Sequence, residues 1–419
     1  MRTDVVDLKV RIDDANREAA TRVVAASPVL VDVAPAGEVI PGLEDRTVLH
    51  SGPPITWSRM CGAQRGAVIG MVLLEGWAST PQDAYALMDR GEIKLEPAHH
   101  YGAVGPMAGT ITRSLPVWVV ENQAFGNRAF CRPAEERQQF GDYGPDAISG
   151  LIQWRDVIAP CLRAAVASEG DIPLKPIIAK ALQMGDELHN RPNAASKLFA
   201  TTIAPALVAA NSDREAVLTT LAHFRYNDFL FLGISMAAAK ASIEPAVGIE
   251  SSCMVTTMAR NGTEFGIRVS GMPERWFTAP APRVEGLLLP GYKPADAGLD
   301  MGDSAITETV GWGGFVIGGA PGILALTGGT PAEALGYTAS MREITISVSP
   351  DYVMPALGFA GAPVGIDIRR VVKTGILPLI DTAIAHKDPG HPKIGAGLTR
   401  PPMACFEAAL KAFAEVVGP

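Results

Sequence analysis

The run MGDELHNRPNAAS holds the densest group of titratable and polar side chains in the sequence. Within six positions, directly before a proline, it places Asp186, Glu187, His189, Asn190 and Arg191. Histidine has an unperturbed pKa near neutrality, so His189 is a candidate general acid or base, and Asn190 and Arg191 are candidate substrate contacts. Because D-E-x-H is not a recognised ligand spacing, we expect no tight metal here. The alternative is a solvated helix end, since helix is disfavoured at the residue before proline.

A second group of polar side chains lies at the turns of a largely apolar, glycine-rich stretch between residues 248 and 329. Where strands are buried, binding groups tend to sit at the turns, because the scaffold holds them rigidly. We expect Arg260 and Asn261 to act together with His189 as catalytic residues. The candidate substrate contacts from the same stretch are Ser251, Ser252, Glu264 and Ser304.

A third group surrounds Arg59 and Arg65, which follow the loop PPITW. A strand pattern precedes this loop and a helical pattern follows it, and the free N–H groups of a helix's first turn can bind an anion. With Ser58 as the helix cap, a phosphate or carboxylate would meet backbone donors and a guanidinium. The alternative is that both arginines are solvated or pair with surface acids. Neither a GxxxxGKS/T motif nor a GxGxxG after a strand occurs, so nucleotide binding is unsupported.

Two pairs of basic side chains complete the candidate substrate contacts. His99 and His100 are adjacent in a glycine-rich loop, where at most one of two neighbouring side chains faces a site if the segment is extended. A purely structural role is the alternative for this pair. His386 and Lys387 precede the turn GHPKIGAG, which we interpret as a second anion contact.

These candidates are spread over stretches that differ in hydrophobic periodicity. Residues 1–145 alternate helical and strand patterns, residues 146–243 are helical, and residues 244–400 return to apolar strands with glycine-rich turns. Residues 401–419 predict an amphipathic docking helix. We therefore expect a mixed α/β (α+β) fold, with a central helical domain between two α/β domains. Ligand clefts tend to form between domains, and there we expect the candidates to meet.

Some local signals predict single elements. STPQDAYALMDRG places Thr80 as a cap, a proline at the first helical position and Gly91 at the far end, which predicts a short helix. IDIRRVV, residues 366–372, looks like a strand. In the final helix, Phe406 and Phe413 share the apolar face that we expect to dock on the core.

Composition excludes several classes of function. With 47% hydrophobic and 19% charged residues, the chain can bury a large core and much subunit surface, which favours a homo-oligomer or hetero-oligomer. The net charge of −8 comes without a basic cluster, so the electrostatic footprint of nucleic-acid binding is missing. The five cysteines form neither a disulfide framework nor a zinc spacing. The first residues lack a signal-peptide pattern, and we expect a cytoplasmic protein.

Several long runs carry a family resemblance: MGDELHNRPNAASKLF, MVTTMARNGTEFGIRVSG, RWFTAPAP, GDSAITETVGWGGF and TAIAHKDPG. Over nearly the whole chain the sequence resembles the bacterial AllG/YlbE-type family. The resemblance implies a subunit of oxamate carbamoyltransferase that works with an FdrA-like and an AllH-like subunit in anaerobic allantoin breakdown. The implied reaction converts oxalurate and phosphate reversibly to oxamate and carbamoyl phosphate. We expect no cofactor.

Carbamoyl transfer places negative charge on a carbonyl oxygen and on phosphate, and it calls for fixed N–H donors, Arg or Lys, and a His that handles the amide proton. The S-T-R-T and H-P-x-Q signatures of aspartate and ornithine carbamoyltransferases are absent, so the site needs another architecture. Two other interpretations stay open. In the first, the chain is a structural or regulatory subunit and a partner subunit carries out the chemistry. In the second, the chain is a ureido or amide hydrolase that needs no phosphate.

Overall fold

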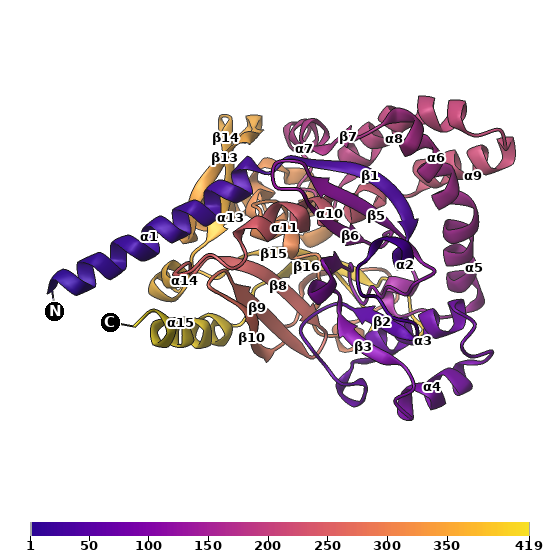
Figure 1. Cartoon of the computed structure of the whole chain (residues 1–419), viewed down its shortest axis with the longest axis horizontal. Coiled ribbons are helices and arrows are strands. Elements are labelled where there is room, and N and C mark those ends of the chain that lie inside the picture. Colours follow the sequence, from indigo (N-terminus) through magenta and orange to yellow (C-terminus); the bar gives the residue numbers. More distant parts are fainter. Residues whose placement is uncertain (1, 419) are drawn as a thin grey trace.

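The computed structural model describes residues 2–418, with side chains from Asp7 to Gly418 (Figure 1). Helices and several small sheets alternate along the chain, which confirms the mixed α/β fold class expected from the sequence. Among the described helices, none is long and apolar enough by itself to cross a membrane. Only the bent pair Arg214–Tyr226 and Leu230–Ala246 reaches that length and apolarity when its members are taken together.

The largest sheet has five strands in the order β4, β6, β5, β1 and β7. Their bounds are Ala103–Val104, Asn127–Cys131, Pro116–Asn122, Pro28–Pro35 and Ile172–Pro173. Strand β1 pairs antiparallel with both β5 and β7. Because β7 comes from the stretch in which we expected only helices, this sheet joins residues on both sides of position 145. The division into domains stays a prediction.

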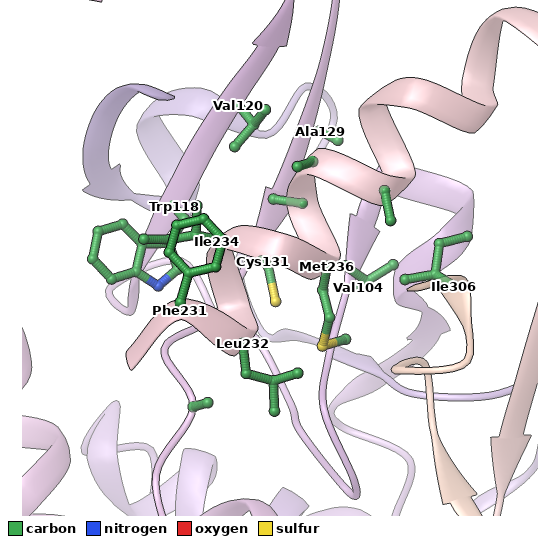
Figure 2. Close-up of a cluster of buried hydrophobic side chains, with 14 of the residues drawn as sticks. Val104, Trp118, Val120, Ala129, Cys131, Phe231, Leu232, Ile234, Met236 and Ile306 are labelled. Atoms are coloured by element: carbon green, nitrogen blue, oxygen red, sulfur yellow. The ribbon is translucent and has the colours of Figure 1, made fainter. Parts of the chain in front are cut away.

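Helix α10 (Leu230–Ile243) covers part of this sheet and is buried along its whole length. Figure 2 shows Phe231 and Ile234 from the helix beside Trp118 and Cys131 from the strands. A helix that is apolar on all sides can only be stable inside a core, which agrees with the run FLFLGISMAAA. A Cβ at Gly233 would lie 2.7 Å from the Arg132 carbonyl oxygen, so glycine allows the close packing of helix and sheet.

A layer of helices flanks the same sheet, along one side of the molecule in Figure 1. Its helices are α5 (Pro145–Gln153), α6 (Ala159–Glu169), α7 (Leu174–Gln183), α8 (Asn193–Ala210) and α9 (Arg214–Tyr226), with a π-helical turn at Trp154–Ile158 between the first two. Helices thus occupy most of the stretch whose periodicity is helical. The loop between α7 and α8 contains the MGDELHNRP run.

The second sheet contains β10 (Met272–Pro280), β9 (Glu264–Val269), β8 (Val255–Asn261) and β12 (Met301–Gly302), in that order and antiparallel. Helix α15 (Met403–Val417) packs on β9 and β10. Phe406 and Phe413 are buried in the same apolar cluster as Phe265 and Ile267. The final helix therefore docks on the core through the face predicted from its sequence.

The remaining strands form small sheets. They are β11 (Glu285–Leu288), β16 (Gly395–Thr399) and β15 (Ile380–Ile384) in one sheet, the hairpin β13 (Thr345–Met354) with β14 (Ala360–Ile366), and the parallel pair β2 (Thr47–His50) with β3 (Lys94–Pro97). The remaining α-helices are α1 (Arg2–Ala25), α2 (Ala36–Val39), α3 (Gly62–Leu74), α4 (Pro81–Asp89), α11 (Ile306–Thr309), α12 (Leu324–Thr327), α13 (Pro331–Ile344) and α14 (Ile368–Thr374).

Two of the local predictions have opposite outcomes. Helix α4 begins where predicted, because the Thr80 hydroxyl accepts a hydrogen bond from the Asp83 N–H at 3.1 Å. The strand predicted over residues 366–372 is wrong. Asp367 accepts a hydrogen bond from the Arg369 N–H at 2.8 Å and caps helix α14, so the apolar residues after it follow helical periodicity.

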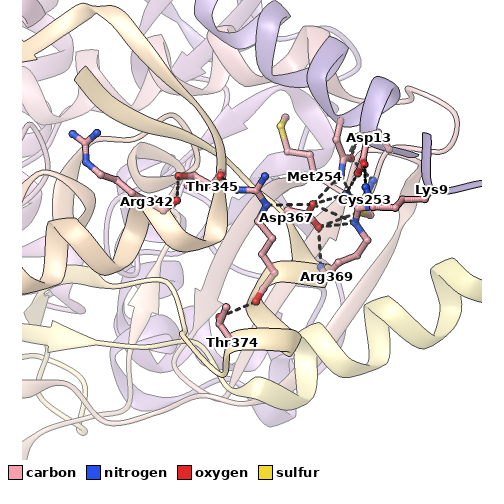
Figure 3. Close-up of polar contacts among 12 residues, drawn as sticks. Lys9, Asp13, Cys253, Met254, Arg342, Thr345, Asp367, Arg369 and Thr374 are labelled. Carbon is pink, nitrogen blue, oxygen red and sulfur yellow. Dashed lines mark hydrogen bonds and ion pairs between the residues drawn. The ribbon is translucent and has the colours of Figure 1, made fainter. Parts of the chain in front are cut away.

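Asp367 also connects α14 to α1, which projects from the body of the molecule (Figures 1 and 3). Its carboxylate accepts hydrogen bonds from Asn16 Nδ2 at 3.2 Å, from Cys253 Sγ at 3.3 Å and from Arg369 Nη2 at 2.7 Å. Arg369 also donates to Asp13 on α1 at 2.7 Å. We call Asp367, Asn16, Cys253 and Arg369 the Asp367 network. It holds the long first helix against the glycine-rich part of the chain.

Candidate functional site

Three segments that are far apart in the sequence bring their acidic and imidazole side chains together inside the protein. Glu187 and His189 come from the loop between α7 and α8, Glu308 from α11, and Asp381 from β15. We call these four residues the His189 centre. His189 and Glu308 are 119 positions apart in the chain, so only the fold makes them neighbours.

The loop that holds His189 is anchored to two neighbouring helices. The Asp186 carboxylate accepts a hydrogen bond from the Ala195 N–H at 2.8 Å, in the first turn of α8. The Ser235 hydroxyl of the buried helix α10 donates to the Leu188 carbonyl at 2.9 Å. Leu188 itself has a φ of 70°, a left-handed conformation that L-residues seldom adopt. The loop is thus held in a strained shape that directs His189 inward.

One nitrogen of the His189 imidazole faces two carboxyl groups. Its Nδ1 is 2.8 Å from Glu308 Oε1 and 3.3 Å from Asp381 Oδ1. The side chain of His189 is 3% exposed, and those of Glu308 and Asp381 are fully buried. Two carboxyl groups beside one imidazole, away from water, can share protons or bind a cation.

Glycines of the GWGGF run let the backbone approach this centre. The Gly314 N–H donates to Glu308 Oε1 at 3.1 Å, and the Gly313 N–H donates to the Glu187 carbonyl at 2.7 Å. Gly313 has a φ of 59°, and a Cβ on it would lie 2.1 Å from Glu308 Oε1 and 3.1 Å from Asp381 Oδ1. The position therefore requires glycine both for its conformation and for space.

Glu308 and Glu187 are well supplied with hydrogen bonds. Thr307 Oγ1 donates to Glu308 Oε2 at 2.9 Å, and the main-chain N–H of His189 donates to Glu187 Oε2 at 2.6 Å. The other oxygen of Glu187 accepts from the Arg191 N–H. Asp381 differs, because neither of its buried oxygens has a hydrogen-bond partner in the described part of the chain. Leaving a buried acceptor unpaired costs about 1–3 kcal/mol.

Burial determines the protonation of the centre. It lowers the pKa of His189 to about 3, so the contact with Glu308 is a hydrogen bond of a neutral imidazole and not an ion pair. Burial raises the pKa of Glu308 to about 7. Burial and the neighbouring Glu308 raise the pKa of Asp381 well above its usual value, and burial with the nearby Asp381 does the same for Glu187. Carboxyl groups with such raised pKa values suit proton transfer near neutral pH.

Arg260 lies beside the centre and is fully buried, with all three guanidinium nitrogens bonded to protein acceptors. Its Nε donates to Asp300 at 2.9 Å, Nη1 to the Gly302 carbonyl at 2.8 Å, and Nη2 to Thr382 Oγ1 at 3.0 Å. Since Thr382 follows Asp381 in β15, the arginine orients this strand. Asn190 Nδ2 donates to the Thr382 carbonyl at 3.2 Å. We therefore propose that Arg260 and Asn190 position the centre.

Four other residues selected from the turns make the following contacts or turn conformations. Asn261 donates to the Pro53 carbonyl at 3.1 Å and accepts from the Glu264 N–H at 2.7 Å, so it shapes the turn after β8. Ser304 Oγ lies 3.5 Å from Arg260 Nη1 and adjoins the centre. Ser252 donates to Asn16 at 3.0 Å and belongs with the Asp367 network. Its neighbour Ser251 has a positive φ of 63°.

The expected anion site after PPITW has a different arrangement. Helix α3 begins at Gly62 with Cys61 before it, so the prediction that Ser58 caps the helix is wrong. Ser58 lies in a separate 3₁₀ turn, and its carbonyl accepts from Arg65 Nη2 at 2.7 Å. Arg59, whose side chain is 54% exposed, pairs with Glu264 at 3.1 Å. That pair joins the N-terminal part of the chain to the second sheet.

The two basic pairs lie apart from the His189 centre. His99 is buried, with Nε2 3.4 Å from Asp303, whereas the neighbouring His100 accepts a hydrogen bond from Trp276 Nε1 at 3.0 Å. Only one of the two points into the interior, although the pair lies in a 3₁₀ turn (Ala98–Tyr101) and not in the extended segment for which we expected this. His386 stacks on His391 with ring centroids 3.8 Å apart, and its neighbour Lys387 is exposed.

Sequence reasoning selected His189, Asn190, Arg191, Arg260 and Ser304 around this centre. It named Glu187 as a member of the same polar run without assigning it a role, and it assigned no role to Glu308 or Asp381. A usable signal was present for the last two. Glu308 begins a long uncharged glycine-rich run, and Asp381 interrupts the apolar strand pattern PLIDTAIA. An isolated acid inside an otherwise apolar element is unfavourable unless it is paired or functional.

Known proteins match this chain along almost its entire length. The family model described as "Oxamate carbamoyltransferase subunit AllG" matches residues 93–304. The oxamate carbamoyltransferase subunit AllG of Escherichia coli (strain K12) is 42% identical over 413 residues, which cover 97% of this chain and 99% of that protein. The uncharacterized protein YahG of the same organism is 45% identical over 411 residues, or 97% of this chain and 87% of that protein.

A solved structure agrees with these sequence matches. The crystal structure of a conserved protein of unknown function from Enterococcus faecalis V583 has a TM-score of 0.96 and 44% identity, with 98% of this chain and 99% of that one covered. Fold and sequence thus match over the same extent, and the His189 centre lies within it. This chain belongs to the family of oxamate carbamoyltransferase subunits named AllG.

Proposed function

We propose that this chain is a subunit of a carbamoyltransferase that interconverts oxalurate plus phosphate and oxamate plus carbamoyl phosphate, or acts on a closely related ureido substrate. The observation that carries this proposal is the 42% identity to an AllG subunit over 97% of the chain. The His189 centre is the site that we assign to the chemistry, since its buried carboxyl groups and neutral imidazole suit proton transfer.

In the proposed reaction a phosphate oxygen attacks the ureido carbon of oxalurate, and the C–N bond to the oxamate nitrogen breaks. The departing nitrogen takes up a proton. Glu308 is the proposed proton donor, because burial raises its pKa to about 7 and keeps part of it protonated at neutral pH. His189 Nδ1 holds this carboxyl group in place at 2.8 Å. General acid catalysis of this kind contributes about 10²- to 10⁴-fold to a rate.

The name of the E. coli relative describes a subunit, and we propose that this chain also works in a hetero-oligomer, with FdrA-like and AllH-like partners. A structural or regulatory role for this chain is the second candidate function. It is favoured by one observation: Glu308 and Asp381 are fully buried and His189 is 3% exposed, so the centre has little open surface in the single chain. A cytoplasmic location belongs to the same proposal.

The test is phosphate-dependent cleavage of oxalurate, measured as carbamoyl phosphate formation by the purified chain alone and together with both partner subunits. We expect activity in the complete complex that requires phosphate. Ammonia release without phosphate would support the hydrolase alternative instead.

Glu308→Gln separates the catalytic role from the structural one. It preserves the shape of the side chain and one of its two acceptor oxygens but cannot donate an acidic proton, and we expect it to lower kcat at least about 100-fold in an assembled complex. His189→Asn is the companion variant. A Glu308→Gln complex with the normal rate would assign the chemistry to a partner. Asp142→Asn, which changes a buried carboxylate paired with Arg137 at 2.8 Å, is the matched control and leaves the rate unchanged.

A further inference from the structure

The ligand atoms of the His189 centre lie almost as far apart as those of a metal coordination shell. Two protein ligands bound at about 2.1 Å on adjacent octahedral or tetrahedral positions lie roughly 3.0–3.4 Å apart. Here Nδ1 of His189 is 3.3 Å from Asp381 Oδ1, within this range, and 2.8 Å from Glu308 Oε1, a hydrogen-bond distance just below it. One atom from each of the three residues lies within 4.8 Å of the other two. The three ligands come from three different elements, and the fold brings them together.

The orphaned carboxylate of Asp381 is a second and independent observation. It is fully buried, and neither oxygen has a hydrogen-bond partner among the described residues. Its neighbours Glu187 and Glu308 each accept hydrogen bonds from backbone or hydroxyl donors. Among these three carboxyl groups, Asp381 is therefore the one whose oxygens are left unpaired. A cation bound to Asp381 would supply the missing partner and offset the cost of leaving a buried acceptor unpaired.

The centre gathers three acidic side chains, Glu187, Glu308 and Asp381, and the nearby cation Arg260 already pairs with Asp300 at 2.9 Å. A divalent cation would displace protons from the carboxyl groups that bind it and balance the charge of the resulting carboxylates, as bound metals do in sites of this composition.

From this geometry we propose that His189, Glu308 and Asp381 bind one divalent first-row transition-metal ion, such as Mn²⁺ or Zn²⁺. An imidazole nitrogen with two carboxylates favours this class over Ca²⁺, which takes oxygen ligands alone. Glu187 is not one of the proposed ligands. Its Oε2 accepts a hydrogen bond from the main-chain N–H of His189 at 2.6 Å. The inference concerns the same centre as the proposed function. With the ion bound, Glu308 would be an ionised ligand and no longer the proton donor, and the metal would instead polarise the ureido carbonyl; binding is measured without any substrate.

The experiment uses the isolated full chain, treated with EDTA and dialysed, and titrated with Mn²⁺ while free Mn²⁺ is followed by electron paramagnetic resonance. Zn²⁺ is titrated in parallel by calorimetry. We expect one ion per chain, and Asp381→Asn should weaken its binding by at least about 10-fold, since even indirect partners of metal ligands contribute 10- to 100-fold. Asparagine has the same shape but a much weaker donor oxygen.

Gly313→Ala is a second variant that retains all three ligands. Its Cβ would lie 2.1 Å from Glu308 Oε1, so it should also weaken binding. Asp367→Asn is the control for a buried carboxylate outside the centre, and His223→Gln is the control for a half-buried imidazole. Both should bind Mn²⁺ like the original chain, provided that circular dichroism shows them folded.

The inference is overturned if the original chain binds neither ion, or if Asp381→Asn and Gly313→Ala bind both ions as tightly as it does. The two proposals can fail separately. Metal binding by the chain without oxalurate cleavage by the assembled complex would remove the proposed function and retain the metal site. Full cleavage by a complex that binds neither ion would do the reverse.

Discussion

Two buried carboxylates in this protein have opposite surroundings. Asp367, 1% exposed, accepts hydrogen bonds from Asn16, Cys253 and the Arg369 side chain and N–H. Asp381 is fully buried as well, yet neither of its oxygens has a hydrogen-bond partner among the described residues. The nearest groups to it are another carboxyl group and a neutral imidazole.

The difference indicates what each region is for. A buried charge with all its partners holds two elements in one arrangement, and the Asp367 network does this for α1 and α14 (Figure 3). A buried group without partners destabilises the fold, and proteins retain such groups mainly where function requires them. The contrast thus separates a structural cluster from a candidate catalytic one, although both contain a buried aspartate.

The largest effect is expected for Arg260→Ala. Removing one member of a buried ion pair leaves Asp300 uncompensated, which costs about 3–5 kcal/mol of unfolding free energy. Urea denaturation of the purified chain measures it. A variant as stable as the original chain would show that Arg260 is not the structural support described here, and would favour the direct catalytic role expected from the sequence.

Asp367→Asn should cost about 2 kcal/mol, the magnitude typical of hydrogen bonds to a charged group. The Arg369 guanidinium would retain only Asp13 as an acidic partner. The oxalurate cleavage rate of the folded complex should not change. Lys9→Ala is the surface control, because Lys9 is 74% exposed and its pair with Asp13 contributes little. A loss of activity without a loss of stability would contradict the division between the two regions.

The stability of the metal-free chain should fall as pH rises from 4.5 to about 7. Glu308 has a raised pKa in the folded state, so the folded chain still holds a proton that the unfolded chain has released. Its contribution is therefore complete below pH 4.5 and is lost as pH passes through about 7. Urea midpoints across this range measure the slope, which Glu308→Gln should reduce. An identical slope in the variant would assign the titration to other groups.

The smallest effect is expected for Arg59→Ala. Arg59 Nη2 lies 3.1 Å from Glu264 Oε1, and the arginine side chain is 54% exposed. Loss of this ion pair should therefore lower the free energy of unfolding by less than about 1 kcal/mol. The KM for phosphate in the assembled complex is the more informative measurement. An unchanged value identifies a surface pair, whereas a marked increase supports the anion contact proposed from the sequence.

Much of the secondary structure could be predicted because its signals are local. Thr80 caps α4 by accepting a hydrogen bond from the N–H of the residue three positions later. Phe406 and Phe413 share one helical face. Predictions failed where a local pattern was ambiguous. IDIRRVV has the apolar content of a strand, but Asp367 inside it is a helix cap, and its other partners lie on α1.

The sequence by itself determined the family, the mixed fold class and the importance of the segment around His189, because long motifs and hydrophobic periodicity are properties of neighbouring residues. Only the tertiary structure decided which groups face that histidine. Glu308 is 119 positions away, and Asp381 comes from a third element, so their approach depends on the packing of a glycine-lined turn against a strand. No pattern along the chain shows which buried carboxylate has hydrogen-bond donors around it and which has none. The donors come from all the elements that pack around the carboxylate, and only the folded structure brings these together.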